Sequence, residues 1–350
     1  MKIVVIADLH IAKVWDKIDK ILPKKLNFLN PNQVFRETIK RINPKDILIF
    51  NGDLVDYHYA SYTKTKDTNW KIFFDILGKH KNHSLFNLGN HDYRKMPYNF
   101  NIYGLKHVNI APETQKKYSK EIGYSKFRYL KEFDSIKVDL EKFNPIPKEL
   151  KKYPKRKKWN NSKIILLNTG PDASTKFRDA INPFNWSSVW SKNPSSLGLL
   201  ESDIKFLQKE LSKADRELLL FLHCPPFLSE GKIPKIKLSK ETYTHNLKNN
   251  NLDCWTFIEN NWSFIETLLK SKRNIVVITS HAHMANQYII DKSTKTLCQS
   301  SLQEINKLRK NSRYIKFIST LPLGALIPSR EIGYLTITES QIKYDIVKKF

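Results

Sequence analysis

The 350-residue chain is predicted to fold as an α/β protein, because two kinds of apolar pattern alternate along it. Short apolar runs typical of buried strands are followed by segments whose apolar residues recur every three to four positions, as on amphipathic helices. Hydrophobic residues make up 40% and aromatic residues 12% of the chain, so a sizeable core can be buried and a disordered chain is excluded. We expect one large domain over residues 1–350, with insertions.

The strand candidates are apolar runs of five to seven residues, at 3–7, 47–51, 84–88, 163–168, 218–223 and 274–280. From about residue 295 the tail adds several further strand-like runs. One helix is expected to begin with Asn30 as its N-cap and Pro31 at its first helical position, followed by a stripe formed by Val34, Phe35, Ile39 and Ile42. Two more helices carry stripes at 3.6-residue spacing: Leu200, Ile204, Leu207 and Leu211, then Ile258, Trp262, Ile265 and Leu269.

Two stretches interrupt this alternation and are predicted to be additions to the domain. The first, from 93 to about 162, is expected to be an insertion or cap, and its basic cluster at 148–159 is expected to be a solvated loop. The second, at about 170–196, is rich in Trp and is expected to be a lid. Its aromatic residues could pack the lid onto the domain, or stack on a base while neighbouring cations bind phosphate.

Charge and cysteine content restrict the partners and the compartment. The net charge of +26 favours anionic substrates and makes nucleic acid a possible partner, although lysine is spread over nearly every segment. The three cysteines, at unrelated spacings, give no disulfide framework and no zinc finger, so a reducing compartment is expected. No run approaches the ~20 apolar residues that span a bilayer, and the first apolar run is too short for a signal peptide. We expect a cytoplasmic protein; the oligomeric state is not indicated.

Polar residues follow five of the predicted strands, at the edge where open α/β sheets place their sites. Singly, each has an ordinary reading: Asp53 could close a turn after Gly52, Asn90 could take a left-handed conformation after Gly89, and His223 could be a core histidine. Five coincidences favour a shared site instead. Carboxylate, amide and imidazole ligands without thiolates suit Mn, Fe or Zn, and they are numerous enough for two ions. The residues are Asp8, His10, Asp53, Asp56, Asn90, His91, Asp92, His223, His281 and His283.

In order and spacing, the blocks "DLH", "GDLVD", "GNHD", a single His and "SHAH" resemble the calcineurin-like metallophosphoesterases over residues 1–290. The resemblance implies a four-layer αββα sandwich, in which two mixed sheets are flanked by helices, with two divalent metal ions at the strand ends, Mn being favoured. It implies Asp53 as the bridging ligand, His91 as the general acid, Asp56 as the residue that orients His91, and Asp92 as a support of the same loop. The remaining ligands would be Asp8, His10 and His283 for the first ion and Asn90, His223 and His281 for the second.

The activity implied is metal-dependent hydrolysis of an anionic phosphoester, by a phosphodiesterase or phosphatase that uses a metal-bridging hydroxide as its nucleophile. The net charge keeps a DNA or RNA nuclease as the alternative, although "DLHIA" lacks the Leu-Gly that follows this histidine in the repair nucleases. A non-catalytic binding scaffold would have lost ligands, and none is missing. Ser280 stands where the family pattern has glycine, a change we expect to be tolerated. Cys224 is expected to face the core.

Overall fold

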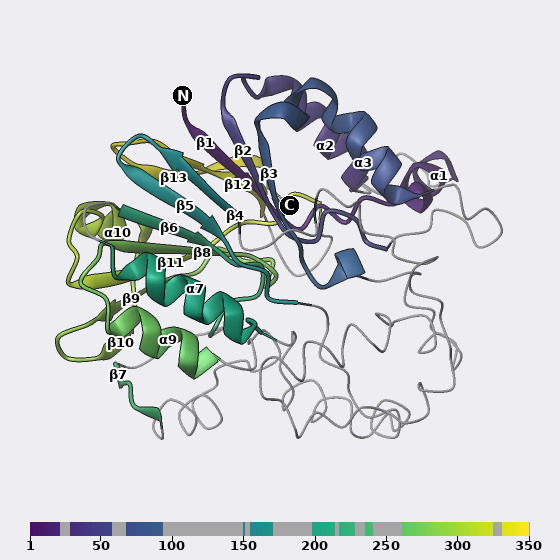
Figure 1. Cartoon of the computed structure of the whole chain (residues 1–350). Coiled ribbons are helices and arrows are strands. Elements are labelled where there is room, and N and C mark those ends of the chain that lie inside the picture. The colour runs from purple at the N-terminus through teal and green to yellow at the C-terminus, as the bar shows by residue number, and fades with distance from the viewer. Residues whose placement is uncertain are drawn as a thin grey trace, which may run out of the picture.

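The computed structural model describes residues 1–21, 29–57, 68–93, 150, 155–170, 198–213, 217–227, 235–240, 261–324 and 331–349. These residues form two mixed β-sheets with helices on the outer faces (Figure 1). The predicted Trp-rich lid and most of the predicted insertion lie outside the described residues, as does Ile258.

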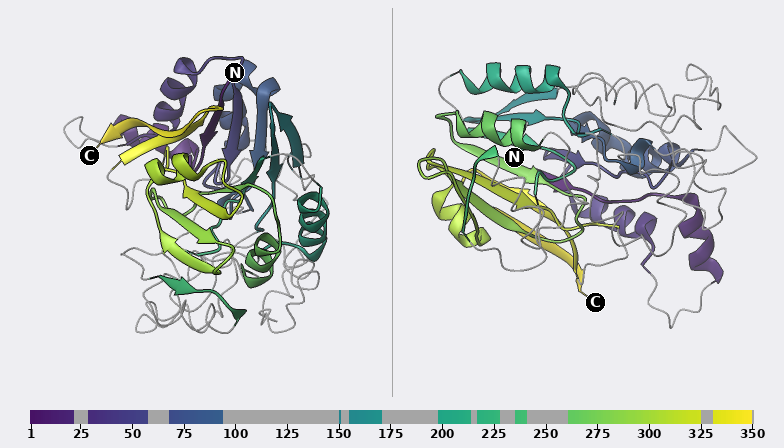
Figure 2. Two further views of the ribbon diagram at one scale, coloured as in Figure 1. Left: turned by 90° about the vertical axis from the view of Figure 1, so that its left-hand side faces the viewer. Right: turned by 90° about the horizontal axis from the view of Figure 1, so that it is seen from below.

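The five-stranded sheet runs in the order β13-β12-β1-β2-β3, in which β1, β2 and β3 are parallel. Its strands are β1 (Ile3–Ile6), β2 (Ile47–Asn51), β3 (Ser84–Asn87), β12 (Glu331–Ile337) and β13 (Ile342–Lys349). The C-terminal strand β13 lies at the outer edge of this sheet (Figure 2). Helices α1 (Lys13–Ile21), α2 (Pro31–Arg41) and α3 (Asn69–Leu77) belong to the same half of the molecule, as do the short 3-10 helices η2 (Gly78–His83) and η3 (His91–Tyr93).

The eight-stranded sheet runs in the order β4-β5-β6-β8-β11-β9-β10-β7, with β5, β6, β8 and β11 parallel. Its strands are β4 (Lys155–Trp159), β5 (Ser162–Leu166), β6 (Glu217–Phe221), β7 (Ile236–Lys237), β8 (Ile275–Thr279), β9 (Gln287–Asp291), β10 (Thr296–Gln299) and β11 (Tyr314–Ser319). Its helices are α7 (Glu201–Leu211), α9 (Asn261–Leu269) and α10 (Leu302–Leu308).

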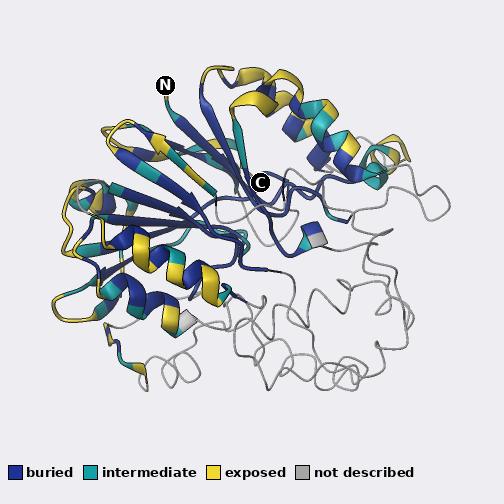
Figure 3. Cartoon of the chain, viewed as in Figure 1, coloured by how far each residue is buried: buried dark blue, intermediate teal, exposed yellow. Residues whose placement is uncertain are grey.

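Three apolar clusters explain why the elements form four layers. Alternate residues of β1 point to opposite faces of the sheet, so Val4 packs toward α2 and α3 while Val5 packs toward the second sheet. The second sheet does the same, since Ile165 faces α7 and α9 and Ile164 faces the first sheet. Figure 3 shows the result as buried strands between helices whose outward faces are exposed. The αββα sandwich implied by the resemblance is therefore confirmed.

Asn30 caps α2 as the sequence predicts: its side-chain oxygen accepts hydrogen bonds from the backbone N–H groups of Asn32 and Gln33. All six predicted strands are present. The basic cluster was predicted wrongly in part, because Lys155–Trp159 is an edge strand and not a loop. It pairs antiparallel with β5, and its cations discourage another chain from pairing with this edge. Within the described residues, no helix is long and apolar enough to cross a membrane.

Candidate metal centre

The predicted site residues come together where the parallel strands of both sheets end. They follow β1, β2 and β3 of the first sheet and β6 and β8 of the second. The backbone there is unusual, because of the seven described non-glycine residues with positive φ, five belong to the site. Such conformations are strained for residues with a Cβ atom and gather at functional sites. These five residues are Asp8, His10, Asp53, His281 and His283.

One group of potential metal ligands includes two residues that follow β1, Asp8 and His10. The Nε2 atoms of His10 and His283 are 3.3 Å apart, and Nε2 of His283 lies 3.7 Å from Oδ1 of Asp8. Together with Asp53, each of these residues offers one atom within 4.8 Å of the others. Imidazole nitrogens and carboxylate oxygens converge here, and both are ligands that divalent transition-metal ions accept. The structure thus brings together the ligand set that the resemblance implies for the first ion.

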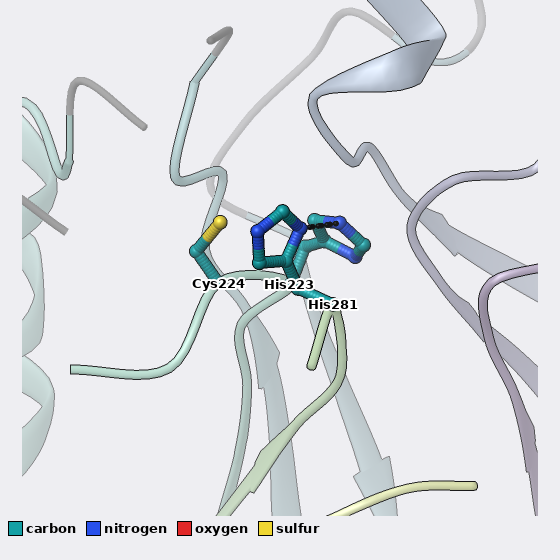
Figure 4. Close-up of side chains that lie close together, drawn as sticks. All are labelled: His223, Cys224 and His281. Carbon is teal, nitrogen blue, oxygen red and sulfur yellow. Dashed lines mark hydrogen bonds between the residues drawn. The ribbon is translucent and has the colours of Figure 1, made fainter. Parts of the chain in front are cut away.

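A second group of potential metal ligands surrounds Nε2 of His223. This atom lies 3.2 Å from Oδ2 of Asp53, 3.1 Å from Oδ1 of Asn90 and 3.3 Å from Nδ1 of His281. Figure 4 shows the two imidazoles side by side, with a dashed line between these two nitrogens. The structure thus also brings together the four residues that the resemblance implies for the second ion.

Asp53 belongs to both groups, and its carboxylate tests whether metal ions fit. Oδ1 accepts a hydrogen bond of 2.8 Å from the backbone N–H of His91. Oδ2 is buried and has no hydrogen-bond donor among the described residues, although it lies 3.8 Å from Nε2 of His10 as well as 3.2 Å from His223. A buried carboxylate oxygen without a donor is costly unless a cation meets it. The residues present therefore fit a pair of cations that share Asp53.

The buried acids and histidines of the site shift one another's pKa. Burial alone would raise the pKa of Asp53, but His223 and then His91 hold it well below its usual range. Burial would likewise lower the pKa of His223, but the Asp53 carboxylate and then Asp8 raise it to about 9. Burial and the neighbouring His223 charge lower the pKa of His281 well below its usual range. A proton on His223 therefore occupies a position that a metal ion would take.

His91 lies beside the two groups with Asp56 behind it. Its Nδ1 is 2.7 Å from Oδ1 of Asp56, so the carboxylate holds a proton on this nitrogen and fixes the orientation of the ring. His10 also approaches Asp56, at 3.5 Å, and the rings of His10 and His91 are 4.4 Å apart. Despite burial, the hydrogen bonds from His10 and His91 lower the pKa of Asp56, which keeps it ionised. This is the relation between His91 and Asp56 that the resemblance implies.

Asp92 holds the loops after β2 and β3 by hydrogen bonds, which is the supporting role expected of it. Its Oδ1 accepts hydrogen bonds from the backbone N–H groups of Leu54 and Val55, and its Oδ2 accepts one from Gly89. Burial and the nearby Asp53 charge raise the pKa of Asp92 to about 8. Asp92 thereby ties the loop after β2 to the loop after β3.

The structure corrects the sequence-based geometry in two places. The strand predicted at 274–280 ends at Thr279, so His281 and His283 lie in the following turn, where their imidazoles belong to different groups. Cys224 is buried in the core, as predicted, yet its sulfur lies within 4.8 Å of ligand nitrogens of His223 and His281 (Figure 4). Strand alternation does not apply to Cys224, because β6 ends at Phe221.

Two buried asparagines beneath the site were missed at the sequence level. Asn51 is the last residue of β2, and its side chain donates to the Leu222 carbonyl across the gap between the sheets. Asn87 ends β3, and its side chain donates to Oδ1 of Asn51 and to the Phe221 carbonyl. Their position as the final residue of a buried strand, just before the GD and GN motifs, was the available signal.

Comparison with solved structures finds proteins that are similar to this chain. A similar fold is found in a dimetal phosphatase from Danio rerio, 13% identical, with a TM-score of 0.51 over 99% of this chain and 95% of that one. A metallophosphoesterase from Sphaerobacter thermophilus is 12% identical, with a TM-score of 0.35 over 100% of this chain and 90% of that one. A 5'-nucleotidase from Candida albicans is 11% identical, with a TM-score of 0.37 over 99% of this chain and 51% of that one.

No curated protein matches the sequence. The sequence model of the calcineurin-like phosphoesterases matches residues 1–309, which include every predicted site residue. A dimetal site is typical of that family, and the described residues contain candidate His and Asp metal sites. The chain therefore belongs to the calcineurin-like phosphoesterase family of metal-dependent hydrolases.

Proposed function

We propose that the protein hydrolyses an anionic phosphodiester or phosphomonoester with two divalent metal ions, Mn being favoured. We assign Asp8, His10 and His283 to one ion, Asn90, His223 and His281 to the other, and Asp53 to both. The observation that carries the proposal is the buried Oδ2 of Asp53, which lacks a hydrogen-bond donor among the described residues and lies between two sets of imidazoles. When bound, such ions supply a water acidic enough to act as nucleophile and neutralise charge on the phosphoryl oxygens.

The protein's own acid–base group in this proposal is His91. Asp56 fixes the ring through Nδ1, so Nε2 can carry the proton that a departing alkoxide needs. Asp56 also stabilises the protonated imidazole, because its lowered pKa keeps it ionised near neutral pH. A donor placed in this way matters most for poor leaving groups. We therefore favour phosphodiesters as the substrate class.

The test compares two leaving groups in the Mn-loaded protein. Methyl p-nitrophenyl phosphate releases a stabilised anion that needs little protonation, whereas methyl phenyl phosphate releases a phenolate whose conjugate acid has a pKa of about 10. We expect His91→Ala to lower kcat for the phenyl ester by about 10²- to 10⁴-fold and to affect the p-nitrophenyl ester much less.

The matched control is His83→Ala, which removes an exposed histidine at the opposite end of β3 and should leave both rates unchanged. An equal loss on both esters in His91→Ala would contradict the general-acid role. No turnover of either ester by the wild-type protein loaded with Mn would contradict the proposed activity.

A nuclease acting on DNA or RNA is the second candidate, and the net charge of +26 is the observation that favours it. Four of these positive charges are consecutive in β4, from Lys155 to Lys158, along one edge of the second sheet. A substrate panel that includes cyclic nucleotides, single-stranded oligonucleotides and phospholipid head groups separates the candidates.

A further inference from the structure

Ser280 is completely buried, and its hydroxyl group contacts the imidazole of His223. Its Oγ is 2.6 Å from the backbone oxygen of Asn51, 3.0 Å from Nδ2 of Asn51 and 3.2 Å from Nδ1 of His223. Ser280 is not among the described residues with positive φ, so its backbone does not need glycine. The serine thus fits the turn and adds a hydroxyl group that glycine could not supply.

We propose that Ser280 is a positioning residue, which fixes the imidazole of His223 through its hydroxyl group so that Nε2 faces the second metal ion. The inference rests on the proposed role of His223 as a ligand. It goes beyond that role because it assigns a task to a residue that would not touch the ion.

The hydrogen-bond chemistry determines which nitrogen of His223 is available. Nδ1 lies 2.9 Å from the backbone oxygen of Asn51, and a carbonyl oxygen can only accept. Nδ1 therefore carries a proton, and Nε2 is the nitrogen that can present a lone pair to a metal ion. Ligand histidines are commonly held in this way by a hydrogen bond to their second nitrogen.

The hydroxyl of Ser280 completes this arrangement because every nearby hydrogen then has an acceptor. It donates to the Asn51 oxygen, and it accepts from Nδ2 of Asn51 and, as a weaker second partner, from Nδ1 of His223. The Asn51 side chain is in turn held by Asn87, whose Nδ2 donates to Oδ1 of Asn51 at 3.1 Å. A chain of polar side chains therefore runs from β3 through β2 to the imidazole.

The position of these polar side chains indicates which of the two ions they would affect. They cross from the first sheet, through Asn87 and Asn51, to the second, at Ser280 and His223. Among the described residues, the hydroxyl group of Ser280 bonds to Asn51 and His223 and not to Asp8, His10 or His283. Loss of the hydroxyl should therefore weaken the site of His223 and leave the other site intact.

The experiment titrates Mn²⁺ into the metal-free, full-length protein by calorimetry and records electron paramagnetic resonance (EPR) spectra of the loaded protein. We expect Ser280→Ala and Ser280→Gly to weaken one of two Mn sites by about 10- to 100-fold, with the other within about twofold of wild type. At Mn concentrations that give wild type a spin-coupled pair, the variants should show isolated Mn²⁺.

Ser319→Ala is the matched control, because it removes another buried hydroxyl group, one bonded to Thr279 and not to the site. It should bind both ions as wild type does, and thermal unfolding confirms that each variant is folded. Wild-type affinity for both ions in folded Ser280→Ala and Ser280→Gly would overturn the proposal. His223→Ala tests the assignment beneath it: if this variant still binds two ions normally, His223 is not a ligand and the proposed function itself fails.

Discussion

Adding one methyl group at Gly89 should disturb both groups of potential metal ligands. A Cβ atom there would lie 2.2 Å from Oδ1 of Asp53 and 2.7 Å from Nε2 of His223, closer than atoms can approach. We expect Gly89→Ala to displace one or both side chains and to weaken Mn²⁺ binding by more than about 10-fold, as a disturbed ligand shell does. Calorimetric titration of the metal-free protein measures this change.

Gly78 provides the control for Gly89, because a Cβ atom there would meet nothing within 4 Å. Its φ of +51° strains any residue with a side chain, so Gly78→Ala should cost about 1 kcal/mol of stability. Its metal affinity should stay unchanged, since the residue lies at the start of η2 and away from the site. Normal Mn²⁺ binding by folded Gly89→Ala would show that the donors have more room than these distances allow.

Lys316 is a buried cation far from the metal centre whose protonation should make stability depend on pH. Its Nζ donates to Oδ1 of Asn274 and to the backbone oxygen of Asn311, and burial lowers its pKa to about 7 from 10.5. Between these two values the unfolded chain binds a proton that the folded protein does not, so stability rises with pH across this window. Below about pH 7 both states are protonated and the contribution is constant.

We therefore expect the stability of wild type relative to Lys316→Met to increase from pH 7 to pH 10, with a slope of at most about 1.4 kcal/mol per pH unit. Urea unfolding of both proteins at each pH measures the difference. Using the difference removes the pH dependence of groups common to both proteins. A difference that is flat with pH would show that Lys316 keeps its proton in the folded state.

At the scale of elements, a strand could be predicted from the sequence where it is buried on both faces. The six predicted strands are mostly buried on both faces, so each is a continuous apolar run that is visible without knowing its neighbours. β4 has no such run: apart from Trp159 its residues are Lys and Arg, exposed or half-buried. Pairing with β5 across the tight turn at Asn160 and Asn161 makes it a strand, and a run of Lys and Arg shows no apolar pattern that would predict this pairing.

The candidate site was easier to predict than its backbone. Order and spacing of the polar motifs were enough to name the residues that converge. The left-handed conformations of His281 and His283 were not predictable, because positive φ is uncommon for any residue other than glycine. The surrounding loops impose it, through contacts such as the hydrogen bond from the His281 backbone N–H to Asp8 across the gap between the sheets.

One buried carboxylate links α7 to the edge of the second sheet. Glu210 of α7 is almost completely buried and pairs with Lys163 of β5, with Lys213 at 2.6 Å and with Arg156 of β4 at 3.6 Å. Glu210→Ala would leave three cations without this partner. We expect a loss of about 1–3 kcal/mol in the free energy of unfolding, measured in urea.

Glu266 of α9 is the matched control for Glu210, because it makes one exposed pair with Lys270 at 3.0 Å. Glu266→Ala should change stability by no more than about 0.5 kcal/mol. Equal losses in the two variants would mean that burial of Glu210 adds nothing to its ion pairs.

At the scale of the whole molecule, the two sheets have different tasks in the proposed site. The first sheet would supply Asp8, His10, Asp53 and Asn90, and the second would supply His223, His281 and His283. Both ions would then require the sheets to be packed together, and the inter-sheet core of Val5, Ile49, Leu219 and Val276 provides that packing. Cytoplasmic localisation stays a prediction from cysteine usage.

The net charge of +26 should govern how substrates arrive at the site. An anionic ester is attracted over distances that salt screens, with a Debye length of about 10 Å at 0.1 M. We expect kcat/KM for methyl p-nitrophenyl phosphate to fall several-fold between 20 and 300 mM KCl while kcat changes little, because salt acts on encounter and not on the bound complex. Steady-state kinetics in Mn²⁺-containing buffer measure both constants.

The same salt series distinguishes the small-ester enzyme from a nuclease. Binding of a single-stranded oligonucleotide weakens with a log–log slope of about 0.7 for each phosphate contacted, so a protein that contacts several phosphates gives a slope of several units. We expect Mn-loaded His91→Ala to bind a 12-nucleotide single strand with a slope no steeper than about one, because lysine is spread over nearly every segment of the sequence and dispersed charge does not follow a strand. A slope of three or more, together with cleavage of the strand by wild type faster than the methyl aryl phosphates, would assign the site to nucleic acid instead.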